Sequence, residues 1–383
     1  MGFRADSDLV AFRRALHRRP EVSGEEGETA AEVAGALRTL GADQVVTGLG
    51  GHGVAAVFAG AAPGPTVMLR CELDALPIQE AGGVDHASTR PGIAHLCGHD
   101  GHMAILMGVA QSLAGRRPAA GRAVLMFQPA EETGAGAAAV LTDPGFAPLR
   151  PDWAFALHNM PGLPLGAARI AEGPANCASV GLQLRLRGRT AHAATPETGL
   201  SPWPALAALI PQILALSQEG ASPVPGAGFA RVTLTHLRLG APSFGIAPGE
   251  AEVFLTLRSL TDAGMDALRR AALGLIEAEA AAQGLAAQWS WHDDFAACTN
   301  DPAAVARLRA ACAATGLPVA PGAPMLASED FGRFGSAGAR AAMLLLGAGE
   351  DHPALHDQRY DFPDVLIAPG VALFRAVLDD LLG

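Results

Sequence analysis

The chain has 383 residues, half of them hydrophobic, and its formal net charge is −11 at pH 7. This length allows two domains, and the acidic balance argues against nucleic acid or an anionic membrane as the main partner. The five cysteines, Cys71, Cys97, Cys177, Cys298 and Cys312, are odd in number and widely spaced, which favours a reducing compartment over a disulfide scaffold. The sequence shows neither a signal-peptide core nor a bilayer-spanning run, so we expect a soluble, cytoplasmic protein without a membrane partner.

The first part of the chain alternates expected helices with short buried strands. Hydrophobic spacing predicts helices over 7–19, 25–40 and 103–113 and strands over 54–58, 66–69, 123–127 and 153–157. Because strands that alternate with helices usually form parallel sheets, we expect an α/β domain with a mostly parallel sheet flanked by helices.

The pattern changes near residue 175. The next expected elements follow the order β-α-β-β-α-β, at 179–186, 201–218, 230–238, 250–258, 262–283 and 286–291. This order is typical of a ferredoxin-like α+β domain. We therefore expect an inserted domain at 175–295, and a first domain made of 1–174 and 296–383.

The segment His95–His102 contains three histidines, a cysteine and an aspartate. These side chains bind zinc and other borderline metals. Cys97 and His99 are two residues apart, so in an extended segment both point to one side and can reach one ion. Gly98 and Gly101 allow the backbone to turn tightly around such ligands.

Carboxylates follow two of the expected strands. Asp74 comes just past the strand at 66–69, and Glu131 and Glu132 follow the strand at 123–127, where open α/β sheets place their active sites. Adjacent residues point in different directions, so one glutamate can bind a metal while the other takes a proton from the bound water. Asp74 can orient a metal-bound histidine by hydrogen bonding.

Three further histidines are candidates. His158 ends the strand at 153–157, His356 lies on a polar loop, and His192 lies in a turn of the expected inserted domain. Each of them taken alone is more often a capped or surface histidine than a ligand. Their combination with the cysteine motif and the paired glutamates favours a metal site.

Taken together, these motifs resemble the M20 metallopeptidase family. The matching segments, in chain order, are Leu16–Glu21, Val67–Glu80, Pro91–Gly108, Met126–Ala137, His158–Pro164, Gly188–Pro196, Ser328–Phe331 and His356–Phe362. The branch that they resemble is the amidohydrolase subfamily of hippurate hydrolases, N-acyl amino acid deacetylases and auxin-conjugate hydrolases. The resemblance covers almost the whole chain, and its most specific parts are Cys-Gly-His-Asp-x-His and Gln-Pro-Ala-Glu-Glu.

The resemblance implies a two-metal centre in a catalytic domain that carries an inserted lid and dimerisation domain. The positions that match the family's metal ligands are Cys97, His99, Glu132, His158 and His356. Glu131 matches the general base, and Asp74 matches the aspartate behind the centre. His192 matches a lid histidine that reaches the scissile carbonyl, in some members from the neighbouring subunit. We expect a structural role for His102, and the role of Glu329 is left open.

The resemblance also implies two divalent ions, an N-acyl amino acid substrate, and a homodimer or dimer-based tetramer through the lid. One thiolate, three imidazoles and one carboxylate suit zinc, manganese, nickel or cobalt, and which metal is bound depends on supply. Two positions depart from the family pattern: Met103 stands where threonine is usual, and Gly245 stands where the lid often has asparagine. The second departure puts the usual lid contact to the substrate in question.

The main hypothesis is a metal-dependent amidohydrolase that cleaves the amide bond of an N-acyl amino acid, with Glu131 as base and His192 stabilising the oxyanion. A dipeptidase or aminopeptidase on the same centre is an alternative that the sequence separates poorly. An inactive metal-binding relic would lack a ligand or the base, and none is missing. A redox protein using Cys97 would need a resolving cysteine, and none lies nearby in sequence.

Overall fold

The computed structural model describes residues 6–218 and 228–383. The chain divides into two compact units. Unit 1 consists of the residues up to Ala175 together with Cys298–Ala323 and Asp330–Gly383, and unit 2 consists of Asn176–Ala297 together with Pro324–Glu329.

An eight-stranded sheet forms the centre of unit 1, in the order β1-β2-β4-β3-β5-β16-β6-β15. Its strands are β1 (Gln44–Leu49), β2 (Gly53–Ala59), β3 (Ala62–Glu72), β4 (Ala120–Gln128), β5 (Trp153–Pro161), β6 (Ala168–Ile170), β15 (Val319–Pro321) and β16 (Arg340–Gly349). The four central strands β4, β3, β5 and β16 are parallel. On one side β2 and β1 continue the sheet with antiparallel pairing, and on the other side β6 pairs antiparallel with β16 and parallel with the edge strand β15. The expected mostly parallel sheet is therefore confirmed.

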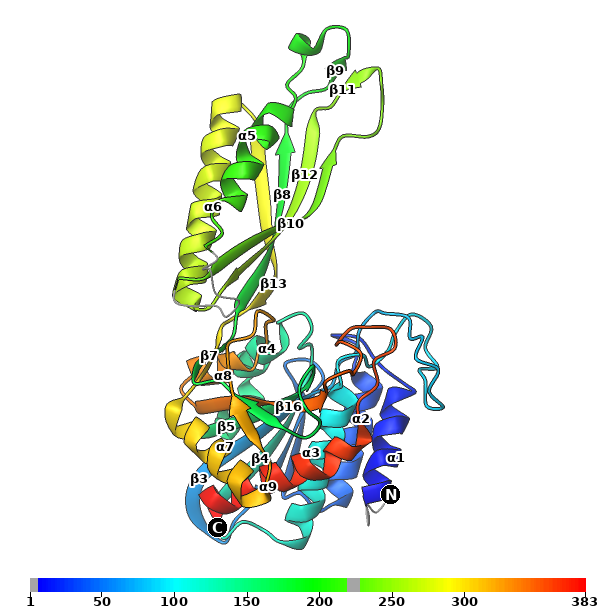
Figure 1. Ribbon diagram of the computed structural model, residues 1–383, viewed down its shortest axis with the longest axis vertical. Coiled ribbons are helices and arrows are strands. Elements are labelled where there is room, and N and C mark those ends of the chain that lie inside the picture. The colour runs from blue at the N-terminus through cyan, green and yellow to red at the C-terminus, as the bar shows by residue number, and fades with distance from the viewer. Residues whose placement is uncertain (1–5, 219–227) are drawn as a thin grey trace. The chain divides into compact units, whose positions relative to one another are not determined.

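Helices cover both faces of this sheet (Figure 1). One face packs against α1 (Asp6–His17), α2 (Gly27–Thr39), α3 (His99–Gly115), α7 (Pro302–Thr315) and α9 (Ile367–Leu382). The other face packs against α4 (Gly136–Thr142), the 3₁₀ helix η1 (Pro144–Leu149) and α8 (Gly332–Ser336). Because α3 lies against β3, α1 and α9 at once, nearly all of its residues are buried, including its polar first turn.

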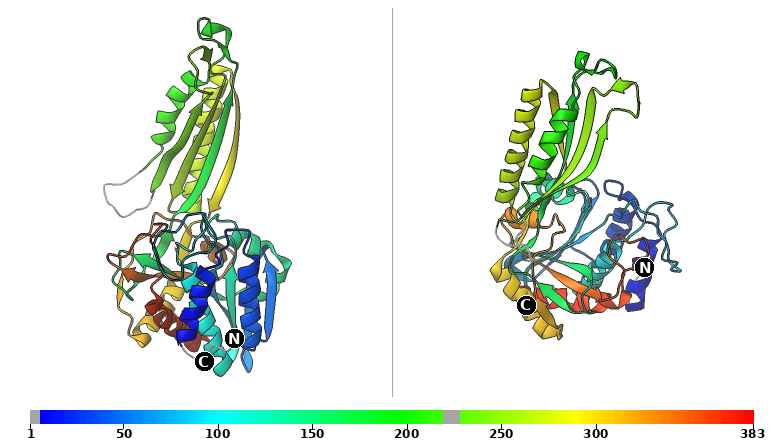
Figure 2. Two further views of the ribbon diagram at one scale, coloured as in Figure 1. Left: turned by 90° about the vertical axis from the view of Figure 1, so that its right-hand side faces the viewer. Right: turned by 45° about the horizontal axis from the view of Figure 1, so that its top comes forward.

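Unit 2 has the ferredoxin-like order that the sequence predicts. Its main elements are β8 (Ala178–Arg187), α5 (Trp203–Leu214), β10 (Ala230–Leu239), β12 (Glu250–Ser259), α6 (Asp262–Gln283) and β13 (Ala286–Phe295). The antiparallel sheet has the order β10-β12-β8-β13, and α5 and α6 lie on one of its faces (Figure 2). Alternate residues of β8 and β12, such as Leu184 and Leu255, are buried beneath the two helices.

Two small ribbons complete the described strands. In unit 2, β9 (Ala191–His192) pairs with β11 (Ile246–Ala247), and elsewhere β7 (Gly173–Asn176) pairs with β14 (Cys298–Asn300). No helix in the described ranges has both the length and the apolar character that crossing a bilayer requires.

Two local predictions are wrong. The segment around Cys97 is not extended, because α3 begins at His99 rather than at residue 103. Its polar first turn carries no apolar periodicity, so the sequence pattern placed the helix start one turn too late. The strand predicted at 66–69 is also too short, because β3 runs from Ala62 to Glu72 and includes Gly64 and Pro65.

Candidate metal centre

The parallel strands of unit 1 bring the candidate residues together. Asp74 follows β3, Glu131 and Glu132 follow β4, His158 lies near the end of β5, and His356 follows β16. These four strands are neighbours in the sheet and point the same way. Their carboxyl ends therefore deliver side chains from distant parts of the chain to one edge, as open α/β sheets do.

A left-handed glycine places the cysteine motif at this edge. Gly98 precedes α3 with φ 93°. A Cβ atom at this position would overlap the side chain of Asn159, so only glycine fits here. Because the chain turns at Gly98, Cys97 and His99 reach the site from a loop and a helix start, not from one extended segment.

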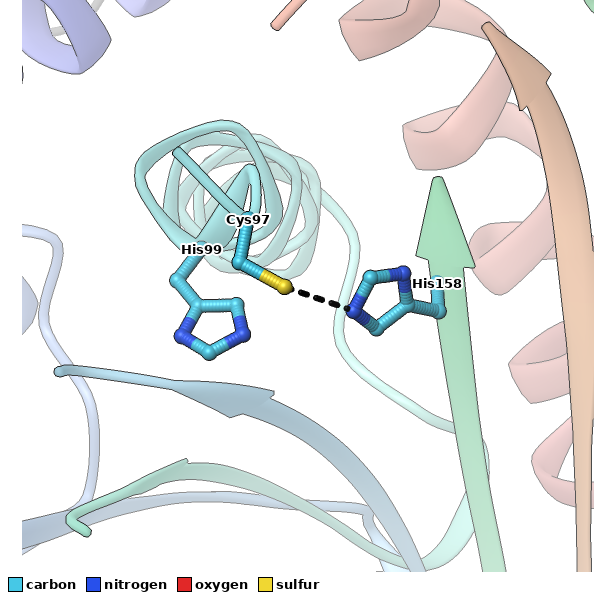
Figure 3. Close-up of side chains that lie close together, drawn as sticks. All are labelled: Cys97, His99 and His158. Atoms are coloured by element: carbon cyan, nitrogen blue, oxygen red, sulfur yellow. Dashed lines mark hydrogen bonds between the residues drawn. The ribbon is translucent and has the colours of Figure 1, made fainter. Parts of the chain in front are cut away.

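Cys97, His99 and His158 form the first group of donors (Figure 3). Their ligand atoms lie within 4.8 Å of one another, and the Cys97 Sγ is 3.5 Å from the His158 Nε2. The Nδ1 of His99 donates to the carbonyl of Asp74 at 2.8 Å, and the Nδ1 of His158 donates to the carbonyl of Asn159 at 2.7 Å. These two bonds leave both Nε2 lone pairs directed toward the thiol, which is how protein-bound metals are commonly held.

The glutamates and His356 form two overlapping groups with the first. Cys97, Glu132 and His356 lie within 4.8 Å of one another, as do His99, Glu131 and Glu132. The Nε2 of His356 is 3.6 Å from a Glu132 oxygen, and the Nε2 of His99 is 3.9 Å from the other. Because Cys97, His99 and Glu132 each belong to two groups, the arrangement suits two ions that share ligands.

The charges around His99 provide a test of whether these residues fit a metal. Burial by itself lowers the pKa of His99, but Asp74, Glu72 and Glu132 together raise it to about 10. The carboxylates thus favour a positive charge at this ring. The Nε2 of His99 is buried and has no hydrogen-bond partner among the described residues. A divalent cation would supply the charge and bind this nitrogen, so the donor set fits a metal.

Cys97 has the properties of a ligand rather than of a reactive thiol. Burial, together with the charges of Glu132 and Glu131, raises the pKa of its thiol well above the usual range. Redox-active cysteines have the opposite property, a depressed pKa and some exposure. All five cysteines are buried, and none of them forms a disulfide in the described chain. Nothing in this geometry supports the redox alternative.

Asp74 forms hydrogen bonds to two of the candidate ligand residues, partly through its backbone carbonyl. Its carbonyl, not its carboxylate, accepts the hydrogen bond from His99, and its Oδ1 is 3.5 Å from the His99 Nδ1. The other carboxylate oxygen accepts from the Ser23 hydroxyl at 2.7 Å and from the Glu132 backbone N–H at 2.9 Å. Burial raises the pKa of Asp74, but His99 and these donors outweigh it and lower the pKa overall.

His102 does not face the donor cluster with a spare nitrogen. Its Nδ1 is 2.6 Å from a carboxylate oxygen of Glu72, and its Nε2 accepts from the backbone N–H of Asn159 at 3.1 Å. Both ring nitrogens are therefore engaged. The bond to Asn159 supports the backbone next to His158, in agreement with the structural role that we expected.

A buried polar network beneath the centre was missed by the sequence analysis. Arg70 contacts Glu72 and donates to Asp330 at 2.7 Å, and Gln128 donates to the same aspartate at 2.8 Å. Asp330 also accepts from the backbone N–H of Ala137 at 2.8 Å. The signal in the sequence was the charged residues at 70 and 72 within an otherwise apolar strand. Glu329, next to Asp330, is buried as well.

A second buried cluster lies on the other side of the cysteine motif. Arg13 donates to Asp100 at 2.6 Å and also contacts Asp361, and His17 lies 2.8 Å from Asp100. His17, His86 and Asp361 are close enough to hold an ion, but the Arg13 guanidinium lies 3.0 Å from the His86 Nε2. This guanidinium already supplies the positive charge, so the cluster is an ion-pair network.

His192 belongs to unit 2, whereas the donors described above belong to unit 1. It is exposed on β9, opposite Ile246 of β11, and its Nδ1 accepts from the Ala194 N–H at 3.1 Å. The neighbouring Phe244 and Ile246 are exposed too. The structure thus joins His192 with the run around Gly245 that departs from the family pattern.

Comparison with known proteins extends these observations. N-acetyl-L-cysteine deacetylase of Bacillus subtilis (strain 168) is 33% identical over 330 residues, which are 86% of this chain and 78% of that protein. N-acetyldiaminopimelate deacetylase of Leuconostoc citreum (strain KM20) is 29% identical over 378 residues, 97% of this chain and 95% of that protein. A solved Bacillus subtilis structure, described as a dinuclear metal binding peptidase from the M20 family, is 26% identical, covers 98% of both chains and has a TM-score of 0.80.

The family comparison covers all the donor groups of the site. The model of the family described as "Peptidase family M20/M25/M40" matches residues 68–380. This range includes the cysteine motif, the paired glutamates, unit 2 and the loop with His356. The chain therefore belongs to peptidase family M20/M25/M40.

Proposed function

We propose that this protein is a metal-dependent amidohydrolase that removes the acyl group from an N-acyl amino acid. The observation that carries the proposal is the cluster of Cys97, His99, Glu132, His158 and His356 with Glu131 beside it, in which Cys97, His99 and His158 are buried, Glu132 is partly buried and His356 is exposed. The two deacetylases named above are similar to this chain over most of its length, and their names describe the removal of an acetyl group from an N-acetyl amino acid. The enzyme is a hydrolase that acts on a carbon–nitrogen amide bond.

The five ligands would hold two divalent ions, with zinc, manganese, nickel and cobalt as candidates, and these ions would polarise the amide carbonyl and acidify water. Glu131 is the proposed base. Its carboxylate lies 4.0 Å from the His99 Nε2 and is outside both donor groups that contain Cys97. In this position Glu131 would accept a proton from the attacking water and then donate it to the leaving amine nitrogen.

We further propose that 175–295 form a lid in which His192 serves the reaction. Because its Nδ1 accepts the Ala194 N–H, the ring carries its proton on Nε2. An exposed Nε2–H is suited to donate a hydrogen bond to the carbonyl oxygen as negative charge develops there. In this proposal residues 1–174 and 296–383 are the catalytic domain, and Asp74 orients the centre.

The lid domain is also the proposed contact for a homodimer or a dimer-based tetramer. In the described chain, β10 and β13 are the outer strands of its sheet, and Leu237 and Trp289 on them are exposed. Open strand edges with apolar side chains favour association. Leu237→Glu or Trp289→Glu should lower the mass measured by light scattering, whereas Leu165→Glu, an exposed apolar site in unit 1, should not. A wild-type monomer at all concentrations would contradict this assembly.

A cytoplasmic location is proposed as well, because the five cysteines are buried and none of them forms a disulfide in the described chain. Titration of the denatured, purified protein should then find every cysteine as a free thiol. Recovery of a native disulfide would contradict a reducing compartment.

The activity is tested with metal-reconstituted protein and a substrate panel. We expect hydrolysis of N-acetyl and other N-acyl amino acids, with kcat/KM at least about tenfold above that for dipeptides with free amino groups, a difference of about 1.4 kcal/mol in activation free energy. Glu131→Gln protein, purified and metal-loaded in the same way, is the control for contaminating activity. Preferential hydrolysis of dipeptides would replace this proposal with the peptidase alternative.

A further inference from the structure

We propose that Glu26 is a positioning residue for the reaction: its carboxylate holds Ala130 in a left-handed conformation, and this conformation aims the neighbouring Glu131. The inference rests on the proposed role of Glu131 as base. It concerns the carboxylate of Glu26, which no part of the mechanism described above uses.

The conformation of Ala130 is the first observation. Its φ is 49°, in the region that residues with a Cβ rarely adopt. Such a conformation persists only where the surroundings enforce it, and it occurs often beside active sites. Ala130 directly precedes Glu131, so its φ and ψ decide where the Glu131 side chain points.

The carboxylate of Glu26 meets this alanine. Its Oε1 accepts the backbone N–H of Ala130 at 2.8 Å and that of Gly24 at 2.9 Å. The turn closes on itself through a bond from the Gly136 N–H to the Ala130 carbonyl at 3.0 Å. On the far side of Glu131, the Glu132 N–H is held by Asp74 at 2.9 Å. The backbone N–H groups on both sides of Glu131 therefore each donate a hydrogen bond to a carboxylate.

The burial of the Glu26 carboxylate is not explained by helix capping. Glu26 occupies the residue before α2, yet its side chain makes no capping hydrogen bond to that helix. The residue is fully buried, and its Oε2 has no hydrogen-bond partner among the described residues. Burial raises the pKa of Glu26, while the bonds from Gly24 and Ala130 act against that rise. Burying a carboxylate is unfavourable unless hydrogen bonds satisfy it. One of the two hydrogen bonds that Glu26 accepts comes from Ala130, in the loop of Glu131.

The experiment compares Glu26→Ala with Glu25→Ala, an exposed neighbour in the same segment. Glu26→Ala should lower kcat by about 10- to 100-fold, as expected when a catalytic group loses its alignment, with KM and metal content nearly unchanged. Glu26→Gln keeps an oxygen acceptor and should restore most of the turnover. Ala130→Gly added to Glu26→Ala should recover part of it, because glycine adopts a positive φ without support.

A readout without catalysis accompanies the kinetics. Amide hydrogen exchange of the peptide that spans residues 128–137 should be faster in Glu26→Ala than in Glu25→Ala, in the presence and in the absence of metal. If Glu26→Ala does not fold, Glu26→Met, which keeps the bulk and removes the acceptor, takes its place. Failure of both to fold would make Glu26 a folding residue and reject the proposal.

Three other results would also reject it: turnover of Glu26→Ala equal to that of Glu25→Ala, a loss of metal that accounts for the defect, or no recovery on adding Ala130→Gly. Glu131→Gln is measured beside these variants. If Glu131→Gln keeps its turnover, the proposed base is wrong whatever Glu26 does. If Glu131→Gln is inactive and Glu26→Ala is not impaired, only the inference about Glu26 fails.

Discussion

At the scale of single residues, the site depends on which nitrogen of each histidine is available. His99 and His158 each donate a hydrogen bond from Nδ1 to a backbone carbonyl, and their Nε2 atoms face Cys97. In His102 both ring nitrogens are hydrogen-bonded, one to Glu72 and the other to Asn159. The hydrogen bonds thus distinguish the three histidines near this thiol. His99 and His158 are suited to bind a metal, whereas His102 stabilises the backbone beside His158.

We expect Cys97→Ser and His99→Ala to lose metal and, with it, activity. Each change removes a donor that belongs to two of the overlapping groups. Elemental analysis after dialysis against trace metal gives the stoichiometry, and His52→Ala, a histidine at a different place in unit 1, is the control. Full metal content in either ligand variant would remove that residue from the ligand set.

Glu131→Gln should behave differently, because the side chain keeps its shape but no longer accepts a proton. Metal content and substrate binding should persist while kcat falls by about 10²-fold or more, within the range of general base catalysis. Single-turnover kinetics and equilibrium binding of a slow substrate measure the two effects separately. A kcat near that of the wild type would require another base.

His192→Ala tests the proposed lid. Loss of one oxyanion donor typically lowers kcat by about 10²–10³-fold, and metal content should stay unchanged because His192 is in none of the three donor groups described above. Steady-state kinetics with metal analysis distinguishes this result from a surface residue whose loss has no effect. An unchanged kcat would reject the role.

The same variant reveals whether subunits share sites. If His192 acts in the neighbouring subunit, mixing inactive His192→Ala with inactive Glu131→Gln subunits should restore partial activity. Verified mixed dimers without any recovery would place His192 in the site of its own subunit.

At the scale of elements, the junction between the cysteine loop and α3 decides the geometry of the site. The helix begins directly at His99 because Gly98 turns left-handed, and its polar first turn is buried with the rest of α3. A helix start of this kind brings a ligand and its neighbour Asp100 to a fixed place. The loop before it stays close-packed against Asn159 and Tyr360.

Gly98→Ala should therefore damage both folding and metal binding. The added Cβ would meet Asn159 and Tyr360, and alanine disfavours the positive φ, so we expect a loss of about 2–4 kcal/mol in unfolding free energy. Gly35→Ala in α2 is the control, because a Cβ there meets nothing within 4 Å, and alanine favours a helix. Urea unfolding and metal titration measure both effects. Equal stability of the two variants would contradict this account of Gly98.

At the scale of the whole molecule, buried charge ties distant segments to the site. Arg13 and His17 of α1 meet Asp100 of α3, and Arg13 also contacts Asp361 near the C-terminal helix. The side chains of Arg13, His17 and Asp100 are fully buried, so removing one partner leaves an unpaired charge. The first helix is thereby joined both to α3 and to the segment before the last helix, beside the loop that carries Cys97.

This cluster predicts a pH dependence of stability. Burial lowers the pKa of His17, but Asp100 and Glu80 outweigh it and raise the pKa from 6.5 to about 9. Because the folded state binds this proton more tightly, the contribution is fully present below pH 6.5 and is lost as the pH rises through 9. Its size is at most about 3 kcal/mol, from 1.36 kcal/mol per pKa unit.

Urea unfolding of metal-free protein at pH 6 and at pH 9.5 measures this contribution. The wild type should exceed His17→Gln in unfolding free energy at pH 6, and the difference should shrink toward pH 9.5. His236→Gln, at an exposed histidine of unit 2, should show no such trend relative to the wild type. A difference for His17→Gln that does not change with pH would mean that its proton is not linked to folding.

The sequence by itself determined the mostly parallel character of the sheet of unit 1 and the ferredoxin-like order of unit 2, because hydrophobic periodicity is a local property. Its short motifs and their family resemblance also named the candidate donor residues. It also placed Asp74, Glu131 and His158 near strand ends. Their roles, and the boundaries of the lid, stay predictions that the experiments above address.

Only the tertiary structure decided how these residues meet. The helix start at His99 depends on a left-handed glycine packed against Asn159, and no local pattern announces that contact. The hydrogen bond between Glu26 and Ala130 joins residues 104 positions apart. Hydrogen bonds over such distances form because distant segments of unit 1 fold around one sheet, so which side chains come together is decided by packing and not by residue type.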